Sequence, residues 1–407
     1  MSSGYRISLP RTGMFLLAMA VSMIPTDGLP GQSPPQLLTA TETLRIDGED
    51  HQFSAINGVL VAPSGRIAVL QPQDHQVRFF SGEGRSLGSF GRRGAGPGEF
   101  QSLLSVAGWL GDTLWVNDSH LRRTTFIGPD RRVQRTLGWP RGLLRAGEVG
   151  GIQPRGLVVP WGFLSANTII TPHASSIHDV MVDGKPRSVS NGIFQVDTIG
   201  HALALVAERA SEESTECIKR WNEGQASGSI TAPFCGVEQF DVSPDGRWIV
   251  ILRPLAPTGT TVASRLVVVD AHGDTVIARR LNAPAERPSA QQRDSVAQSM
   301  RVLANGGLGR TMPAAAVRAI ATIEVPTQFP MVDGVLVGSD RTVWLQRPAA
   351  GSSRAWWIVS ADGGAVYRTV IPTTVALHVV SKEAVWGIDT NAEGVESIVR
   401  YTIRGWQ

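Results

Sequence analysis

Residues that could carry out chemistry are few in this 407-residue chain, and most of them lie far apart. The chain lacks both the C-x-x-C and the H-E-x-x-H spacings, which are strong sequence signals of a zinc site. Its eight His are dispersed, and only His173 and His178, with Asp179 adjacent, lie close together. A further polar run, Asn117 to His120, follows an expected strand. An isolated loop His is more often a surface residue than a ligand, so these residues predict no metal site.

The two Cys, Cys217 and Cys235, lie in one polar segment. In an exported protein such a pair is most simply a disulfide. Closing a loop of this size would stabilise the fold by about 3 kcal/mol, because it lowers the entropy of the unfolded chain. A pair of metal ligands is the alternative, but no His lies at ligand spacing beside either Cys. We therefore expect a Cys217–Cys235 disulfide.

Short strands must position these residues. A strand–turn–strand unit recurs, for example Val77–Gly84 leading into Leu87–Phe90, and a second strand pair precedes it, such as Val59–Gly65 leading into Arg66–Leu70. Runs of β-branched and aromatic residues separated by Gly or Asp turns are hairpin signals. Four strands repeated about every 40–50 residues are the signature of a β-propeller. Six such units predict an all-β fold, a six-bladed β-propeller of four-stranded antiparallel blades.

The repeat is irregular in the third blade and at the chain ends. Gly156–Val159 and Asn167–Ile170 are the best inner strand pair for blade 3. The last unit lacks an outer strand, while Thr43–Ile46 stands alone before the first blade. An open edge strand is an aggregation hazard, so we expect Thr43–Ile46 to complete the final blade. The propeller is then expected to span 43–407.

Two insertions interrupt the β pattern, a Cys-containing one at 208–232 and a helical one at 285–325. In the second, Ser289 and Gln292 have the spacing of a capping box, and apolar residues follow at helical spacing. A second short helix is expected at Pro313–Ile320. The helical insertion is either a lid or docking element over one face, or a decoration that covers apolar surface beside a blade, and we favour the decoration.

The N-terminus indicates export. Arg6 and Arg11 precede the apolar run Met14–Ile24, and a polar stretch rich in Gly and Pro follows. This order is typical of a secretory signal peptide, and the run is too short for a spanning helix of about 20 residues. We expect a signal peptide at 1–28, a flexible leader at 29–42, no transmembrane segment in the mature chain, and a periplasmic or secreted location.

Blade 1 and its exit, Asn57–Phe100, resemble an NHL repeat, and the whole chain resembles the exported bacterial six-bladed β-propeller proteins. The Gly91–Phe100 loop, with four Gly and a terminal Phe, is the most specific match. A strand rather than a helix follows it, which favours a blade junction over a phosphate-binding loop. Propeller lyases and lactonases hold metal ligands at the ends of inner strands around the central channel. The resemblance therefore implies these candidate ligand-binding residues: His51, Asp118, His120, His173, His178 and Asp389.

The charge of the chain does not indicate a particular binding partner. The chain has 38 Lys and Arg against 35 Asp and Glu, a net charge of +3, and its Arg are scattered in short pairs. A nucleic-acid-binding protein gathers basic residues on one face or stripe, so we expect no nucleic-acid partner.

The leading interpretation is a monomeric, non-enzymatic propeller without a cofactor. It would bind or scaffold an unknown protein or small ligand at one propeller face or at the channel mouth. The alternative is a lyase or hydrolase that depends on a divalent metal in the central channel. Fold alone does not decide between the two.

Overall fold

Apolar segments rich in β-branched residues form the strands nearest the centre of the molecule. Every residue of β4 (Ile67–Gln71) is buried, because this strand is paired on both sides, with β3 (Gly58–Val61) and β5 (Gln76–Phe80). The structure is a computed structural model, and it describes residues 35–140, 158–182, 185–210, 217–224, 226–304, 312–348 and 351–406.

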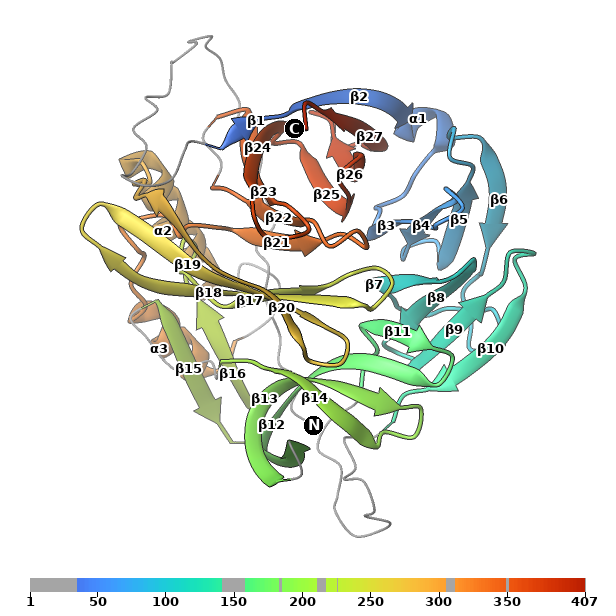
Figure 1. Ribbon diagram of the computed structural model, residues 1–407, viewed down its shortest axis with the longest axis horizontal. Helices are drawn as coiled ribbons and strands as arrows, with labels where there is room; N and C mark the ends of the chain where they lie inside the picture. The colour runs from blue at the N-terminus through green and yellow to red at the C-terminus, as the bar shows by residue number, and fades with distance from the viewer. Residues whose placement is uncertain are drawn as a thin grey trace.

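Six blades of four antiparallel strands surround a common axis as in a propeller (Figure 1), and one blade gains a short fifth strand; this confirms the expected fold. The strands of each blade are given from the centre outward. Blade 1 holds β3, β4, β5 and β6 (Ser86–Phe90). Blade 2 holds β7 (Leu103–Leu110), β8 (Thr113–Asp118), β9 (Arg123–Ile127) and β10 (Val133–Gly138). Blade 3 holds β11 (Gly162–Ser165), β12 (Thr168–Val182), β13 (Lys185–Asp197) and β14 (Ala202–Glu208).

The second half of the ring follows the same order. Blade 4 holds β17 (Gln239–Val242), β18 (Trp248–Thr258), β19 (Thr261–Asp270) and β20 (Thr275–Pro284). Blade 5 holds β21 (Gly334–Val337), β22 (Val343–Gln346), β23 (Ser353–Val359) and β24 (Val366–Pro372). Blade 6 holds β25 (Val375–Val380), β26 (Ala384–Thr390), β27 (Glu396–Arg404) and a strand from the N-terminal segment.

The N-terminal segment closes the ring. Strand β2 (Thr39–Ile46) pairs antiparallel with β27, so the expectation that Thr43–Ile46 completes the last blade is confirmed. The strand begins earlier than expected, at Thr39, and β1 (Gln36–Leu37) pairs parallel with β24 of blade 5. The described end of the expected leader, 29–42, is therefore mostly strand. The expected signal peptide, 1–28, lies outside the described residues.

The prediction that Gly156–Val159 forms the first strand of blade 3 is wrong. The innermost strand is β11, whose Phe163 is opposite Ile169, whereas Val158 and Val159 form no strand. Val158 is fully buried in the cluster that holds Trp115 and Phe163, at the junction of blades 2 and 3. The apolar pattern there reflects burial between blades and not strand pairing.

The Gly91–Phe100 loop joins blades 1 and 2. Phe100 is fully buried in a cluster with Phe79 and Trp109. Gly91 has φ +105°, and a Cβ there would lie 2.6 Å from the Phe100 ring. Only Gly tolerates this conformation and this close approach, so the loop is a packed junction, as the sequence indicates.

Both expected helices of the second insertion form. Helix α2 (Ala290–Ala304) begins at the expected capping box, in which the Ser289 N–H donates to the Gln292 side chain (2.8 Å) and the Gln292 N–H donates to the Ser289 hydroxyl (3.1 Å). Helix α3 (Ala314–Ala321) follows it. The first insertion forms the hairpin β15 (Ile218–Glu223) and β16 (Ala226–Thr231), and a short helix, α1 (Gly48–His51), links β2 to β3.

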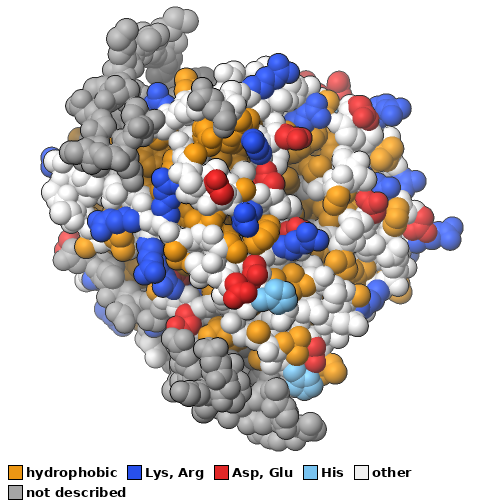
Figure 2. All heavy atoms as spheres, viewed as in Figure 1, with side chains coloured by type: hydrophobic (Ala, Val, Ile, Leu, Met, Phe, Trp, Pro, Cys, Tyr) orange, Lys and Arg blue, Asp and Glu red, His pale blue; other side chains and the backbone are white. Residues whose placement is uncertain are grey.

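The path of the chain gives the ring two unlike faces. Connections between blades, and loops between second and third strands, lie on one side. We call it the insertion face because it carries the described parts of both insertions, 217–224, 226–238, 285–304 and 312–333. Tight turns such as Ala62–Arg66 and Ser243–Arg247 lie on the other side, the turn face. On the face shown in Figure 2, basic and acidic side chains are interspersed. No helix among the described residues has the length and apolar character needed to cross a membrane.

Candidate functional site

The two insertions pack against each other beside blade 4. Ile230 of the hairpin is buried with Met300 of α2 and Ile320 of α3 in one apolar cluster. The Glu223 carboxylate accepts the Ala315 N–H at 2.6 Å, which fixes the hairpin to the start of α3. Figure 1 shows α2, α3, β15 and β16 together at the edge of the ring, close to the β18–β19 hairpin. They form one small unit at the edge of the ring, and the choice between a lid and a decoration stays a prediction.

Arg347 anchors the segment that leads from this unit back to blade 5. Its guanidinium donates to the Glu286 carboxylate at 2.9 Å and to the Met331 carbonyl, which are at opposite ends of the helical insertion. The side chain is 7% exposed and lies over the ring of Trp357. Burial lowers the pKa of Arg347. The Phe329 N–H also donates to the Glu286 carbonyl at 2.8 Å, so the end of the insertion is firmly placed.

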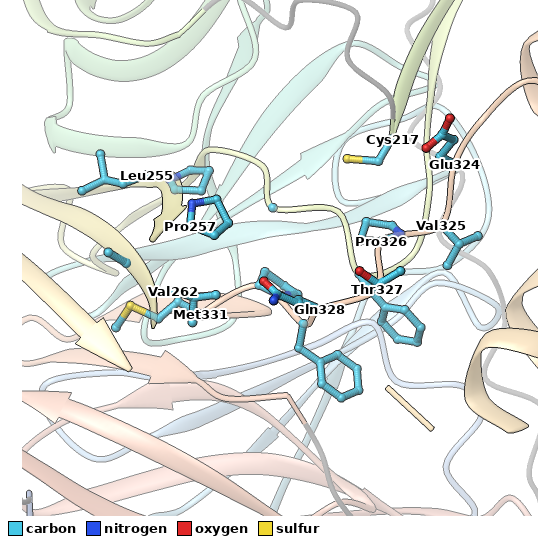
Figure 3. A pocket seen from close by; sticks show the side chains of 16 residues that line it. Cys217, Leu255, Pro257, Val262, Glu324, Val325, Pro326, Thr327, Gln328 and Met331 are labelled. Carbon is cyan, nitrogen blue, oxygen red and sulfur yellow. The ribbon is translucent and has the colours of Figure 1, made fainter. Parts of the chain in front are cut away.

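A pocket of about 460 Å³ lies between this segment and the β18–β19 hairpin. Figure 3 shows Leu255 and Pro257 on the hairpin side, the 325–328 segment across from them, and Cys217 with Glu324 at one end. Among the described lining residues, four Pro and two Phe dominate, none is Lys or Arg, and Glu324 is exposed. The described lining residues are Cys217, Phe234, Gly236, Pro254, Leu255, Pro257, Val262, Ala263, Glu324, Val325, Pro326, Thr327, Gln328, Phe329, Pro330 and Met331.

The expected disulfide is confirmed and belongs to this pocket. Cys217 and Cys235 are bonded across a Cα–Cα distance of 5.7 Å. The bond ties Cys217, at the base of the β15–β16 hairpin, to Cys235 in the segment that leads into blade 4, and Cys217 lines the pocket. The pocket wall is thus covalently held on one side and held by Arg347 on the other.

Of the six candidate residues from the sequence, Asp118 is fully buried and has a structural task. Its carboxylate accepts the N–H groups of Gln101 (2.6 Å), Ser102 (3.2 Å), His120 (3.0 Å) and Leu121 (3.0 Å). It therefore joins the loop that enters blade 2 to the loop between β8 and β9. His120 is exposed at the surface of that second loop.

His51 lies in α1 and packs against aromatic rings. Its ring stacks on Phe53 with a centroid distance of 5.7 Å and meets the edge of Phe80 at 5.1 Å. Arg78 donates to the backbone carbonyl of His51. These contacts place His51 at the junction of blades 6 and 1, away from the channel.

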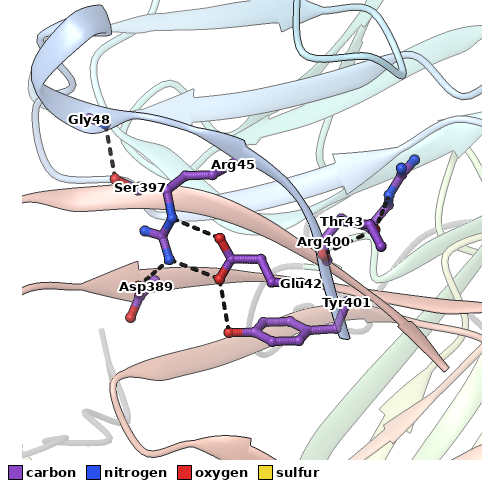
Figure 4. A network of polar contacts seen from close by, with 8 residues as sticks. All are labelled: Glu42, Thr43, Arg45, Gly48, Asp389, Ser397, Arg400 and Tyr401. Carbon is purple, nitrogen blue, oxygen red and sulfur yellow. Dashed lines mark hydrogen bonds and ion pairs between the residues drawn. The ribbon is translucent and has the colours of Figure 1, made fainter. Parts of the chain in front are cut away.

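Asp389 belongs to the closure of the ring (Figure 4). Its carboxylate accepts a hydrogen bond from Arg45 at 2.8 Å, and Arg45 also binds Glu42 at 2.8 Å. The Tyr401 hydroxyl donates to Glu42 at 3.2 Å, and burial together with the Glu42 charge raises the pKa of Tyr401 to about 12. This network fastens β2 to blade 6.

His173 and His178 lie in the far half of β12, opposite Gly192 and Val189 of β13. Their side chains are outside the part of the chain that the structure describes. By chain path all six candidates lie toward the insertion face. Their described side chains form no common site.

One short motif in the chain has the form G-x-S-x-G, Gly84 to Gly88. Its Ser86 begins β6, the exposed outer strand of blade 1, and no helix follows. A nucleophile elbow needs a strand, a sharp turn and a helix. The motif is therefore part of an ordinary hairpin.

A second cavity, of about 140 Å³, lies in the central channel and is lined by innermost strands. Its walls are mostly Val, Leu and Ala, and of the described residues that line it only Asp241 and His378 titrate. Asp241 is in β17, and its carboxylate accepts the Val337 N–H from β21 at 2.9 Å. Burial raises the pKa of Asp241 to about 7. No ion-pair partner of Asp241 is present among the described residues.

His378 reaches the same cavity from blade 6. It is the extra residue of a β-bulge in β25, because Leu377 is opposite Gly387 while Val379 is already opposite Trp386. Bulges re-aim side chains and occur often beside functional sites. Burial lowers the pKa of His378 to about 4, so the imidazole is neutral at neutral pH. Protein surrounds both side chains, yet each keeps some surface toward the cavity.

The sequence analysis missed both channel residues. Asp241 precedes the turn Ser243–Arg247, where an acid looks like an ordinary turn residue. The bulge at His378 breaks the two-residue alternation on which strand interpretation depends. The alternative of a metal-dependent lyase or hydrolase stays a prediction. No group of three or more His, Cys, Asp or Glu placed to hold a metal occurs in the described ranges.

Comparisons with known proteins agree with the fold. No known protein family and no curated protein matches the sequence. Among solved structures, the chain is similar to a member of the DUF4221 family from Bacteroides vulgatus, at 10% identity and a TM-score of 0.51, over 90% of this chain and 97% of that one. A putative exported protein from Bacteroides fragilis has 9% identity and a TM-score of 0.42, over 91% and 96% of the chains. Virginiamycin B lyase from Staphylococcus aureus has 10% identity and a TM-score of 0.37, over 90% and 99%.

Taken together, the sheet topology and the similarity to the DUF4221 structure define the class as a six-bladed β-propeller. At such identities the similarity shows the fold alone.

Proposed function

We propose that this protein is a binding propeller whose ligand is a small, uncharged and largely apolar molecule. The pocket between the β18–β19 hairpin and residues 324–331 supports this proposal. Its volume of about 460 Å³ lies within the range of roughly 300–1,000 Å³ that is usual for small-molecule sites. Four rigid Pro and two Phe supply apolar surface that loses little conformational entropy on binding.

The lining favours a neutral ligand. An anionic ligand would need a cation, and the lining residues that the structure describes include neither Lys nor Arg. Thr327 and Gln328 supply a hydroxyl and an amide that can orient one polar group of the ligand. The disulfide fixes the Cys217 end of the pocket and Arg347 fixes Met331, so these parts of the site are positioned before a ligand binds.

Ligand-observed NMR with a panel of uncharged aromatic and aliphatic fragments tests the proposal. We expect fragments to bind the wild type, and Val325→Asp to weaken that binding at least tenfold, because it places a charge in the apolar wall. Val302→Asp is the matched control, since Val302 is 48% exposed on α2 and does not line the pocket. Equal binding by both variants, or no fragment that binds the wild type, would contradict the proposal.

We propose that the protein acts outside the cytoplasm as a monomer. The Cys217–Cys235 disulfide supports this location, since such bonds persist in oxidising compartments. Mass spectrometry of the protein expressed in a bacterial host should find a mature N-terminus near residue 29 in the periplasm or medium. Full-length protein in the cytoplasm would contradict export, and a dimeric mass in solution would contradict the monomer.

A further inference from the structure

The channel cavity is a second site, separate from the apolar pocket, because the two share no lining residue. It brings one carboxyl group and one imidazole, from blades 4 and 6, into a space otherwise walled by aliphatic side chains. We propose that this cavity binds a small alkylammonium ion, with the Asp241 carboxylate as counter-ion and the unprotonated ring nitrogen of His378 as a second acceptor.

The charge of the site selects a cation. A carboxyl group without an ion-pair partner, buried among Val and Leu, is unfavourable in its ionised form, and a cationic ligand relieves that cost. An anion would meet this carboxyl and a neutral imidazole, and no described Lys or Arg lines the cavity. Of the two signs of charge, the site therefore favours a positive one.

The size and walls of the site select the alkyl part. A volume of about 140 Å³ holds about four or five water molecules at roughly 30 Å³ each, so the ligand has only a few heavy atoms. Val59, Leu60, Val337 and Val379 offer apolar contact to methyl groups. On the turn-face side the channel is narrow, since a Cβ on Gly108 would lie 3.0 Å from the Pro244 carbonyl oxygen.

The strands that carry Asp241 and His378 position both side chains at the cavity. The Val337 N–H fixes the Asp241 carboxylate, so the counter-ion is positioned before a ligand arrives. The bulge at His378 interrupts the regular pairing of an innermost strand and turns an imidazole toward the cavity.

Binding should release a proton below neutral pH. The ionised carboxylate is the binding form, and burial keeps Asp241 largely protonated up to about pH 7. We expect methylammonium affinity to rise about tenfold for each pH unit between pH 5 and 7 and then to level off. His378 adds no further step in this range, because its ring is already neutral above about pH 4.

Isothermal titration with methylammonium chloride tests the proposal on the full mature chain. At pH 6, titrations in two buffers of different ionisation enthalpy should show nearly one proton released per ion bound. Asp241→Asn should weaken binding more than tenfold, and His378→Gln should weaken it by a smaller factor. Asp362→Asn, an exposed turn-face acid, is the matched control and should leave binding unchanged.

Three results would overturn the proposal. The first is equal binding of methylammonium by the wild type and Asp241→Asn, and the second is binding without proton release. The third is binding of methanol or of Zn²⁺ where methylammonium does not bind. The proton count and the methanol comparison use only the wild type, so they decide the matter even if Asp241→Asn fails to fold.

Discussion

The carboxylate of Asp241 and the backbone N–H of Val337 form a 2.9 Å hydrogen bond that joins the innermost strands of blades 4 and 5 at the channel wall. The same carboxyl group is buried, and its pKa is raised to about 7. An Asn side chain can accept the same N–H but cannot ionise. Substitution therefore separates the hydrogen bond from the charge.

Asp241→Asn should raise stability at pH 8 and not at pH 4. The pKa of this carboxyl is 3.8 in the unfolded chain and about 7 in the folded protein. Its contribution to stability is therefore fully present below pH 3.8 and is lost as the pH rises to about 7. Asn cannot ionise, so the variant keeps the free energy of unfolding that the wild type loses. This difference is a few kcal/mol, at about 1.4 kcal/mol per pKa unit. Thermal unfolding across pH 4–8 measures it.

His378→Gln should change stability with the opposite dependence on pH. The pKa of His378 falls from 6.5 to about 4 on folding, so its contribution is present above pH 6.5 and lost as pH falls to about 4. This variant should gain stability over the wild type only in acid. If the stability of both variants depended on pH in the same way as that of the wild type, the two channel groups would not control the pH dependence of stability.

Removal of the closing strand should cause association. A chain that begins at Asp47 lacks β1 and β2, which leaves β27 as an unpaired edge beside buried Ile398 and Val399. A chain that begins at Pro35 is the control. Light scattering and size-exclusion chromatography should show aggregates only for the shorter chain. A soluble, monomeric and equally stable shorter chain would mean that β2 is dispensable.

Gly91→Ala should destabilise the junction of blades 1 and 2. The new Cβ would meet the Phe100 ring at 2.6 Å, and φ is +105° there. We expect a loss of about 2 kcal/mol or more in the free energy of unfolding. Gly138→Ala is the control, because a Cβ there has no neighbour within 4 Å. Equal unfolding temperatures for the two variants would contradict a tightly packed junction.

Loss of the disulfide should loosen the insertions more than the ring. Replacing Cys217 and Cys235 by Ala removes the link at the base of the β15–β16 hairpin, worth about 3 kcal/mol in the chain-entropy treatment. We expect faster hydrogen exchange and proteolysis at 217–235, and weaker fragment binding in the adjacent pocket. Slow exchange at β26 is the internal reference. Unchanged protection of the hairpin would show that packing against α3 suffices.

Local patterns allowed much of the fold to be predicted. The Gly and Asp turns between β-branched runs predicted four strands per blade, because hairpin formation depends on neighbours in sequence. Ser289 and Gln292 predicted the start of α2 for the same reason. The closing role of Thr43–Ile46 followed from one missing strand and one surplus strand. Blade 3 failed at Val158, where an apolar run is buried without forming a strand.

The functional sites depended on contacts that are distant in sequence. Asp118 and Asp389 were reasonable candidates by position. In the structure, however, the Asp118 carboxylate accepts loop N–H groups and the Asp389 carboxylate binds Arg45. The pocket exists only where residues 254–263 and 324–331 meet, and the channel site only where β17 and β25 face one centre.

The sequence by itself determined the number of blades, the closure of the ring, the disulfide and the helical insertion, because each follows from periodicity, capping or a unique pair of Cys. The tertiary structure alone decided which side chains line the channel and the pocket. A single bulge at His378 changes the face toward which the side chains beyond it point, and the burial that raises the pKa of Asp241 is supplied by strands from other blades. Such effects have no signal in the local sequence, because they arise from the register and packing of distant strands.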